Sequence, residues 1–452
     1  MGSILLKDCF FIQPSAFMEG IRGADILIEG ADIRRIGPSL TAARGARVID
    51  CSRHVVVPGF VNTHHHFFQT LTRNLPAVQN AKLFDWLVYL YEVWKRIDGE
   101  AVHVSSLLAM GELLKTGCTC TTDHLYLYPR GVNADFAALQ FKAAETLGMR
   151  FCPTRGSMSL SRKDGGLPPD SVVQDEDTIL ADSERVIRQF HDPAPRAMRK
   201  VALAPCSPFS VSEGLLLRTA RLARAQGVRL HTHLAETADE DAYCMEKHGV
   251  RPVALMERCE FIGPDVSYAH GIHFNDDELA VLRRRGAQVA HCPSSNMRLG
   301  SGICRVRDML DAGIPVSLAV DGSASNDSSD FLGEMRNALL LQRVARGSAA
   351  LGAREVLKMG TETGAAVLGF QGIGRIEEGY AADIAVFDVG RMEYSGSLSD
   401  PFAALLFSGY DHGSAYTICN GKVVVDNGRL TGVDEDALTV DANRIAARLL
   451  NP

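Results

Sequence analysis

Short apolar runs and stretches of helical periodicity alternate through the middle of the chain. A short apolar run bounded by turn residues predicts a buried strand, whereas apolar residues at every third or fourth position predict a helix. Eight runs fit the first pattern: residues 55–62, 119–123, 150–155, 201–206, 229–236, 266–271, 288–293 and 315–322. Helical stretches include residues 133–148, 212–227, 276–286 and 331–345, and Gly148, Gly227 and Gly286 stand where helix C-caps are expected. Strands that alternate with helices predict a parallel sheet, and eight repeats predict an α/β fold with a closed (β/α)8 barrel of the TIM type.

The two ends of the chain carry a different pattern. Short alternating segments separated by turn residues, at 26–30, 34–37 and 47–50 near the start and at 382–388 and 422–428 near the end, predict antiparallel strands. Both ends are therefore expected to pair into one small, split β-sandwich domain. The expected division is the first part of the β-sandwich (residues 1–57), the barrel (58–369), and the second part of the β-sandwich with a C-terminal helix (370–452).

Composition limits the classes of function. A chain of 452 residues with 46% hydrophobic content can bury a large core, and a net charge of -7 argues against a dedicated nucleic-acid or membrane binder. The sequence contains no apolar stretch long enough to span a bilayer, and its first residues lack a basic region leading into one. Eleven irregularly spaced cysteines fit reduced thiols better than a disulfide framework. We therefore expect a soluble, cytoplasmic protein.

Two histidines at the end of the first apolar run give the strongest chemical signal. His64 and His66 directly follow the apolar residues 55–61. Because side chains alternate along a strand, these two imidazoles point to one side while His65 points away. Neutral imidazole is a common protein ligand for zinc, so this pair predicts part of a metal site.

Later apolar runs also end in residues that bind metals. His233 with Glu236 three residues on, His270, and Asp321 each stand at the end of such a run. Alone, each has a structural interpretation, because His270 fits a hydrogen-bonded core histidine and Asp321 fits a helix cap. Together they fall at the C-terminal ends of the expected barrel strands, where barrel enzymes carry their chemistry. The constellation therefore predicts one metal centre.

These residues carry a family resemblance. The segment 58–66, PGFVNTHHH, is similar to the strand-one signature of the amidohydrolase superfamily, and His233-x-x-Glu236 and Asp321 resemble its strand-five and strand-eight signatures. The resemblance covers essentially the whole chain, including residues 374–388, and indicates the cytosine, guanine and triazine deaminase branch. It implies that Zn²⁺ is bound by His64, His66, His233 and Asp321, with Glu236 and His270 beside it in catalytic roles.

The resemblance also implies how many metal ions to expect. Members with two metals use a carboxylated lysine or a glutamate from strand four, and residues 201–206 contain neither. One Zn²⁺ is therefore expected, with Fe²⁺ or Mn²⁺ as replacements, because ligand sets of nitrogen and oxygen do not select zinc strongly. A homo-oligomer is expected from the family alone.

The same resemblance implies a mechanism of hydrolytic deamination. A metal ion lowers the pKa of water enough to supply hydroxide near neutral pH. Asp321 would take the proton of the water and return it to the departing ammonia, and Glu236 would protonate a ring nitrogen next to the attacked carbon. His270 would hold the attacking oxygen and stabilise charge on it.

The substrate is indicated by fewer residues. Gln69 stands three positions after His66, which is similar to guanine-type deaminases, whose glutamine contacts the purine edge. An amide can donate and accept together, as a purine edge requires, although a polar helix start also explains Gln69. The segments 65–73, 83–87 and 90–94 most closely resemble deaminases that convert 8-oxoguanine to urate and ammonia.

Three further residues are candidate substrate contacts. Trp94 fits a ring that stacks on a planar substrate, but together with Trp86 it also fits a core-facing helical stripe. Arg155 would contact a carbonyl oxygen or take part in a structural ion pair. Cys206 opens the loop after strand four, where guanine deaminases place an arginine that this loop lacks. Guanine, isoxanthopterin or another pterin, and a hydroxylated s-triazine therefore remain alternative substrates.

Two other functions compete with deamination. A ring-opening cyclic amidohydrolase would need the strand-four lysine of the two-metal members, which residues 201–206 lack. A non-catalytic assembly protein on the same barrel would have lost ligand positions that are filled here. The sequence therefore favours an enzyme that acts on a small heterocyclic molecule, with no nucleic-acid or membrane partner.

Overall fold

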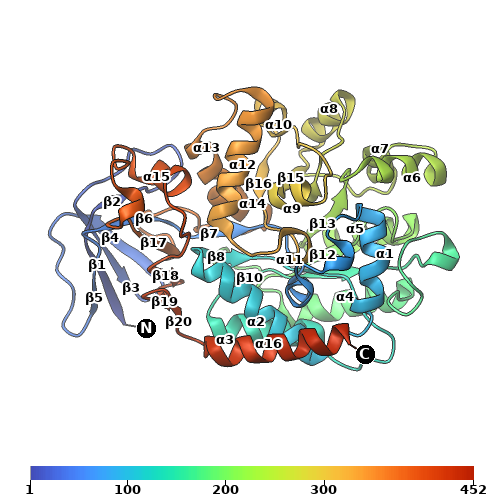
Figure 1. The fold of residues 1–452 in the computed structure, drawn as a ribbon, viewed down its shortest axis with the longest axis horizontal. Coiled ribbons are helices and arrows are strands. Elements are labelled where there is room, and N and C mark those ends of the chain that lie inside the picture. The colour runs from blue at the N-terminus through green and yellow to red at the C-terminus, as the bar shows by residue number, and fades with distance from the viewer. Residues whose placement is uncertain (1, 452) are drawn as a thin grey trace.

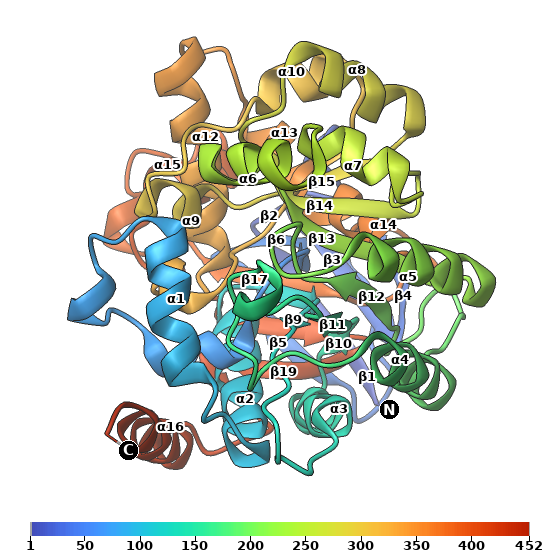
Figure 2. The same ribbon diagram turned by 90° about the vertical axis from the view of Figure 1, so that its right-hand side faces the viewer.

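The structure, a computed structural model that describes residues 2–451, is built around a closed barrel of parallel strands (Figures 1 and 2). One parallel sheet has the order β16-β15-β14-β13-β12-β11-β9 and a second has the order β10-β8-β7. Hydrogen bonds from the Thr63 amide to the Leu318 carbonyl (3.2 Å) and from the Asp321 amide to the His64 carbonyl (3.1 Å) join the first strand to the last. The predicted TIM-type barrel is confirmed. Its strands are β7 (Phe60–Asn62), β8 (Cys118–Thr121), β9 (His124–Leu125), β10 (Arg150–Phe151), β11 (Thr154–Ser157), β12 (Ala202–Pro205), β13 (Arg229–Leu234), β14 (Val266–His270), β15 (Gln288–His291) and β16 (Val316–Leu318).

The helices cover the outside of this ring of strands. Gly148, Gly227 and Gly286 adopt φ values of 72°, 66° and 76° at the ends of α3, α5 and α8, so the three predicted C-caps are confirmed. The outer helices are α2 (Gly99–Lys115), α3 (Phe136–Leu147), α4 (Glu176–Phe190), α5 (Glu213–Gln226), α6 (Ala238–His248), α7 (Pro252–Arg258), α8 (Asp276–Arg285), α10 (Val306–Asp311), α12 (Phe331–Arg346), α13 (Ala353–Lys358) and α14 (Gly364–Val367). The helices around the barrel mouth are the 3-10 helix η1 (Phe67–Thr72) and the α-helices α1 (Leu83–Trp94), α9 (Pro293–Arg298) and α11 (Ser323–Asn326).

The first apolar run, residues 55–62, is two strands rather than the single barrel strand that the sequence predicts. β6 (His54–Pro58) pairs antiparallel with β17 (Ile384–Asp388), and only β7 belongs to the barrel. The chain changes sheets at Gly59, where an added Cβ would lie 2.2 Å from Thr119 Oγ1. Both strands are buried, so one continuous apolar pattern hides the break between them.

Both ends of the chain form the small β module at the left of Figure 1. One sheet has the order β4-β3-β1-β5 and the other the order β2-β6-β17-β18-β19-β20. Side chains such as Ile28, Val56 and Ile384 fill the space between the sheets. The strands of the module are β1 (Ser3–Cys9), β2 (Phe11–Ile12), β3 (Ala24–Glu29), β4 (Asp32–Gly37), β5 (Arg47–Asp50), β18 (Tyr416–Cys419), β19 (Lys422–Asp426) and β20 (Arg429–Leu430), and the short helix α15 (Pro401–Phe407) lies beside them.

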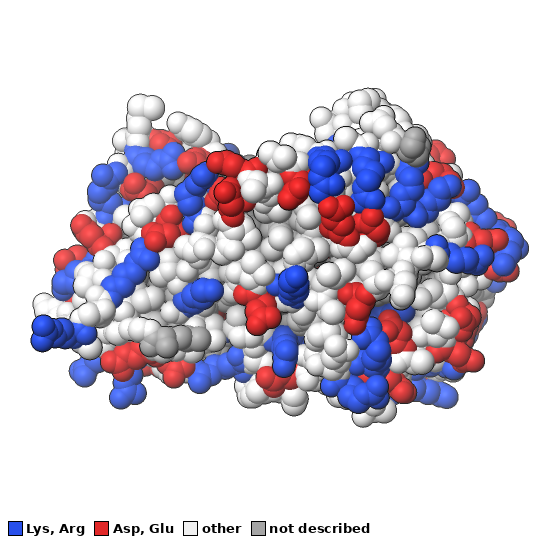
Figure 3. All heavy atoms as spheres, turned by 90° about the horizontal axis from the view of Figure 1, so that it is seen from below, with Lys and Arg blue, Asp and Glu red and all other residues white. Residues whose placement is uncertain are grey.

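The C-terminal helix, α16 (Glu435–Leu450), lies along α2 on the barrel and not on the β module with which the sequence groups it (Figure 1). Arg448 pairs with Asp98 at 2.6 Å and Arg444 pairs with Glu100 at 2.6 Å. Within residues 2–451, helices that combine the length and the apolar character needed to cross a bilayer are absent. Acidic and basic side chains intermingle over the face of the molecule shown in Figure 3.

Candidate metal centre and substrate cavity

Four barrel strands bring the candidate ligands to one place. His64 and His66 directly follow β7, His233 lies in β13, and Asp321 comes three residues after β16. His270 is the last residue of β14, and it and Asp321 adopt φ values of 75° and 63°, in the left-handed region that non-glycine residues rarely occupy. Such backbone strain concentrates at functional sites, and here it affects two of the residues that the sequence singles out.

The spacing of the ligand atoms fits a metal ion. His66 Nε2 lies 3.0 Å from His233 Nε2, and Asp321 Oδ1 lies 3.3 Å from His64 Nε2 and 3.4 Å from His66 Nε2. Zinc bonds of ~2.1 Å in tetrahedral geometry place ligand atoms about 3.4 Å apart. His64 Nε2 is buried and faces the Asp321 carboxylate at a distance that is long for a hydrogen bond, as expected of two atoms that bind one cation. The donor set therefore fits zinc.

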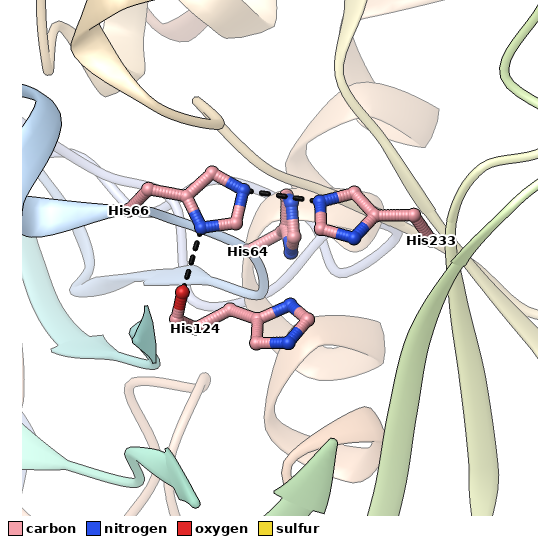
Figure 4. Close-up of side chains that lie close together, drawn as sticks. All are labelled: His64, His66, His124 and His233. Carbon is pink, nitrogen blue, oxygen red and sulfur yellow. Dashed lines mark hydrogen bonds between the residues drawn. The ribbon is translucent and has the colours of Figure 1, made fainter. Parts of the chain in front are cut away.

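Backbone carbonyl groups fix the orientation of two of these rings, and Figure 4 shows one of them, the His124 carbonyl that His66 faces. His66 Nδ1 donates to the carbonyl of His124 at 2.7 Å, and His233 Nδ1 donates to the carbonyl of Cys206 at 2.7 Å. A proton held at Nδ1 leaves the Nε2 lone pair free to face the centre. The ring of His124 belongs to a second cluster with the three ligand histidines, but its Nε2 contacts the Ala204 carbonyl at 3.1 Å.

A second histidine, rather than a carbonyl, orients His64. His64 Nδ1 lies 2.8 Å from His231 Nε2, and His231 Nδ1 lies 2.8 Å from Ser267 Oγ. If His64 Nε2 binds a metal, Nδ1 carries the proton and donates to His231, which in turn donates to Ser267. His231 is not among the candidate residues that the sequence singles out. Its i, i+2 spacing from His233 is the signal that places both rings on the same side of β13.

The surroundings of the two acidic groups of the centre shift their pKa values in opposite directions. Burial raises the pKa of Glu236 well above its usual value, and the nearby Asp321 charge adds to the effect. Burial also works to raise the pKa of Asp321, but the hydrogen bond and charge of His64, with the charges of His270 and His66, hold it well below its usual value. A protonated carboxyl beside an ionised one can supply the acid and the base of one reaction.

His270 lies between these carboxyl groups. Its Nε2 is 3.4 Å from Glu236 Oε2 and 4.0 Å from Asp321 Oδ2, and the Asn296 amide donates to its Nδ1 at 3.0 Å. Burial lowers the pKa of His270 to about 4, so the ring is neutral at pH 7. Since Nδ1 accepts from Asn296, the ring proton is on Nε2 and points into the site. The sequence analysis did not assign this role to Asn296.

A cavity opens beside the centre. His66, His233, Glu236, His270 and Asp321 line one part of it. Gln69 and Cys206, two predicted substrate contacts, also line the cavity. The rest of the wall comes mainly from α1, through Leu83, Trp86, Leu87 and Tyr91, and from Tyr126, Phe209 and Leu299.

Two predicted substrate contacts, Trp94 and Arg155, do not line this cavity. Trp94 is fully buried, and its Nε1 donates to Thr72 Oγ1 at 3.1 Å, whereas Trp86 is the tryptophan that lines the cavity. Helical spacing places both rings on one face of α1, so the pattern could not separate them. Arg155 pairs with Asp182 at 2.8 Å and lies over the ring of Tyr128, so the ion-pair interpretation holds for it.

Comparison with known proteins adds to this geometry. The model of the amidohydrolase family matches residues 55–424. The chain is 44% identical to 8-oxoguanine deaminase of Pseudomonas aeruginosa, with 95% of each chain covered, and 38% identical to isoxanthopterin deaminase of an unknown prokaryotic organism, with 95% of this chain and 92% of that one covered. Among solved structures, atrazine chlorohydrolase from Arthrobacter aurescens complexed with zinc is similar, with a TM-score of 0.93, 30% identity, and 98% of this chain and 100% of that one covered.

Proposed function

The chain belongs to the amidohydrolase family and is a hydrolytic deaminase of a purine-like heterocycle, and we propose that it converts 8-oxoguanine to urate and ammonia with one zinc ion. One observation carries this proposal. The ligand atoms of His64, His66, His233 and Asp321 converge, and Glu236 and His270 stand beside them at the wall of the same cavity.

The four ligands of the proposed zinc ion are the three Nε2 atoms and a carboxylate oxygen of Asp321. When bound, the ion supplies Lewis acidity that lets water ionise near neutral pH. β12, the fourth barrel strand, reads Ala-Leu-Ala-Pro and offers no lysine or carboxylate for a second ion. Fe²⁺ or Mn²⁺ would fit the same nitrogen and oxygen donors.

Three residues move protons or hold the reacting oxygen in this proposal. The ionised Asp321 accepts a proton from the attacking water and later gives it to the departing amino group, which leaves as ammonia. The protonated Glu236 donates to the ring nitrogen next to the attacked carbon, so that negative charge does not build up on the heterocycle. When the carbonyl forms, the remaining proton of the attacking oxygen is released and restores the protonated Glu236. The Nε2–H of His270 donates a hydrogen bond to the attacking oxygen.

The choice of 8-oxoguanine rests on the cavity and on the similar proteins. The Gln69 side chain lies over the backbone of Gly322 at the cavity wall, and its Oε1 accepts from the Ala324 amide at 3.4 Å. An amide at this place can donate to and accept from a purine edge. Cys206 begins a loop without the arginine that guanine deaminases use. The similarity to isoxanthopterin deaminase favours that pterin as the second candidate, since it too is an amino-substituted two-ring compound with ring oxo groups.

Ammonia release tests the proposal directly. Zinc-loaded protein is assayed with 8-oxoguanine, guanine, isoxanthopterin and hydroxyatrazine, and the product of each is identified by its ultraviolet spectrum. We expect the highest kcat/KM with 8-oxoguanine. Turnover of the triazine alone would contradict the purine assignment, and ring opening without ammonia would favour a cyclic amidohydrolase.

The proposal keeps two expectations from the sequence, a cytoplasmic location and a homo-oligomeric assembly. The size of the particle in solution, measured by light scattering on the zinc-loaded protein, tests the second. A monomer at micromolar concentration contradicts it.

A further inference from the structure

Two polar atoms on the α1 side of the cavity have no partner. Trp86 Nε1 and Tyr91 Oη are buried and make no hydrogen bond with any part of the chain that the structure describes. Trp86 is 3% exposed and Tyr91 is 0% exposed, and both side chains line the cavity. A buried donor without an acceptor costs free energy, so each such atom in a native structure calls for an explanation. Here the explanation available to both is a ligand in the cavity they share.

The part of the ligand that these atoms meet follows from the rest of the wall. His233, Glu236, His270 and Asp321 belong to the reacting end and must face the amino-bearing carbon. The α1 wall belongs to a different element, at one side of the ring of strands in Figure 2. A planar two-ring substrate whose reacting carbon is at the metal centre therefore presents its remote ring to this wall.

The chemistry of the two atoms selects the group that they bind. An indole N–H only donates, and a tyrosine hydroxyl can donate as well. The other α1 residues at this wall, Leu83 and Leu87, are apolar. The α1 wall therefore offers the ligand no charged side chain. A neutral acceptor suits such a pair, whereas a C–H or an amino group would leave the indole donor unpaired.

We propose that Trp86 and Tyr91 form a subsite for an oxo group on the ring remote from the amino-bearing carbon. The inference rests on the proposed function and adds to it the feature that selects the substrate. In 8-oxoguanine that group is the oxygen at C8, which guanine lacks. A site built to hydrogen-bond a substrate group discriminates strongly against the analogue without it, because its own polar atoms are then left unpaired.

Urate and xanthine, the deamination products of 8-oxoguanine and guanine, test this subsite by binding alone. The two purines differ only in the C8 oxygen, and neither needs to be turned over. Dissociation constants for both are measured by calorimetry on zinc-loaded wild type, Tyr91→Phe and Trp86→Phe. We expect each variant to bind urate about 10- to 100-fold more weakly, and to bind xanthine within about threefold of wild type. The kcat/KM for 8-oxoguanine should fall by a similar factor to the urate affinity.

The same helix provides two controls. Tyr89→Phe removes a hydroxyl from an exposed side chain, and Trp94→Phe alters a buried indole whose N–H is already bonded to Thr72. Both should keep the urate-to-xanthine affinity ratio of wild type. Zinc content and the thermal unfolding midpoint of every variant report on folding.

Each outcome separates the subsite from the function. Suppose that wild type deaminates 8-oxoguanine, and that Tyr91→Phe and Trp86→Phe lose urate and xanthine affinity equally or lose neither. This result overturns the subsite and leaves the proposed function standing. Wild type that releases no ammonia from 8-oxoguanine or isoxanthopterin shows that the proposed function itself is wrong, and the subsite falls with it.

Discussion

The two sides of the substrate cavity are built in different ways. At the metal end, each ligand ring is held from behind, His66 and His233 by backbone carbonyl groups and His64 by His231. On the α1 side, Trp86 Nε1 and Tyr91 Oη are buried without a partner in the described chain. The metal end is therefore oriented before any ligand arrives, whereas the α1 side becomes satisfied only when a ligand of the right chemistry binds. The groups that react are pre-oriented by the protein, whereas substrate selectivity depends on hydrogen bonds that only a matching substrate completes.

The strongest test of this contrast removes the acidic ligand. Asp321→Asn keeps the shape of the side chain but removes both a charged ligand and the proposed base, so we expect kcat/KM to fall at least about 10⁴-fold. Zinc per chain, measured by mass spectrometry, should also fall. The affinity of this variant for urate should equal that of metal-free wild type. Near-normal deamination by Asp321→Asn would remove the basis for the proposed centre.

The next test separates acid catalysis from metal binding. Glu236→Gln removes the proton that the heterocycle needs, and since Glu236 is not a ligand we expect kcat to fall about 10²- to 10⁴-fold with zinc content unchanged. Glu240, whose carboxylate accepts from the Ala235 and Glu236 amides, offers a matched variant, because Glu240→Gln perturbs the same loop without removing the proposed donor. Equal losses in the two variants would point to loop geometry instead of proton donation.

A smaller effect is expected from the group behind His64. His231→Asn removes the acceptor 2.8 Å from His64 Nδ1, and loss of such a supporting hydrogen bond typically weakens metal binding about 10- to 100-fold. Zinc affinity is measured by competition with a chromophoric chelator, with Ser267→Ala expected to show a lesser loss. His103→Gln, on α2 and half-buried, serves as the histidine control. Unchanged affinity in His231→Asn would mean that the His64 ring is held by packing alone.

The same contrast shows what could be predicted from the sequence. The cluster of candidate metal ligands was predictable because apolar strands end in these residues, and strand ends meet at one mouth of a barrel. Gly59 was missed as a change of sheet because β6 and β7 are both buried and share one apolar run. Trp86 and Trp94 share a helical face, so spacing could not tell which ring reaches the cavity. Whether a buried N–H is paired depends on side chains distant in sequence, and only coordinates reveal it.

The smallest expected effect concerns Arg155, which lies outside both sides of the cavity. Its ion pair with Asp182 and its hydrogen bond to Gln174 tie strand β11 to the chain around α4. Arg155→Met removes one of the two arginines that pair with Asp182, the other being Arg185 at 2.8 Å, and also removes the hydrogen bond to Gln174. We therefore expect the free energy of unfolding to fall by ~1–3 kcal/mol, with kcat/KM within about twofold of wild type. Chemical denaturation and the ammonia assay measure the two quantities. A variant that keeps its stability but loses activity 100-fold would show that Arg155 contacts the substrate. Substrate binding would then involve a third region of the protein besides the metal end and α1.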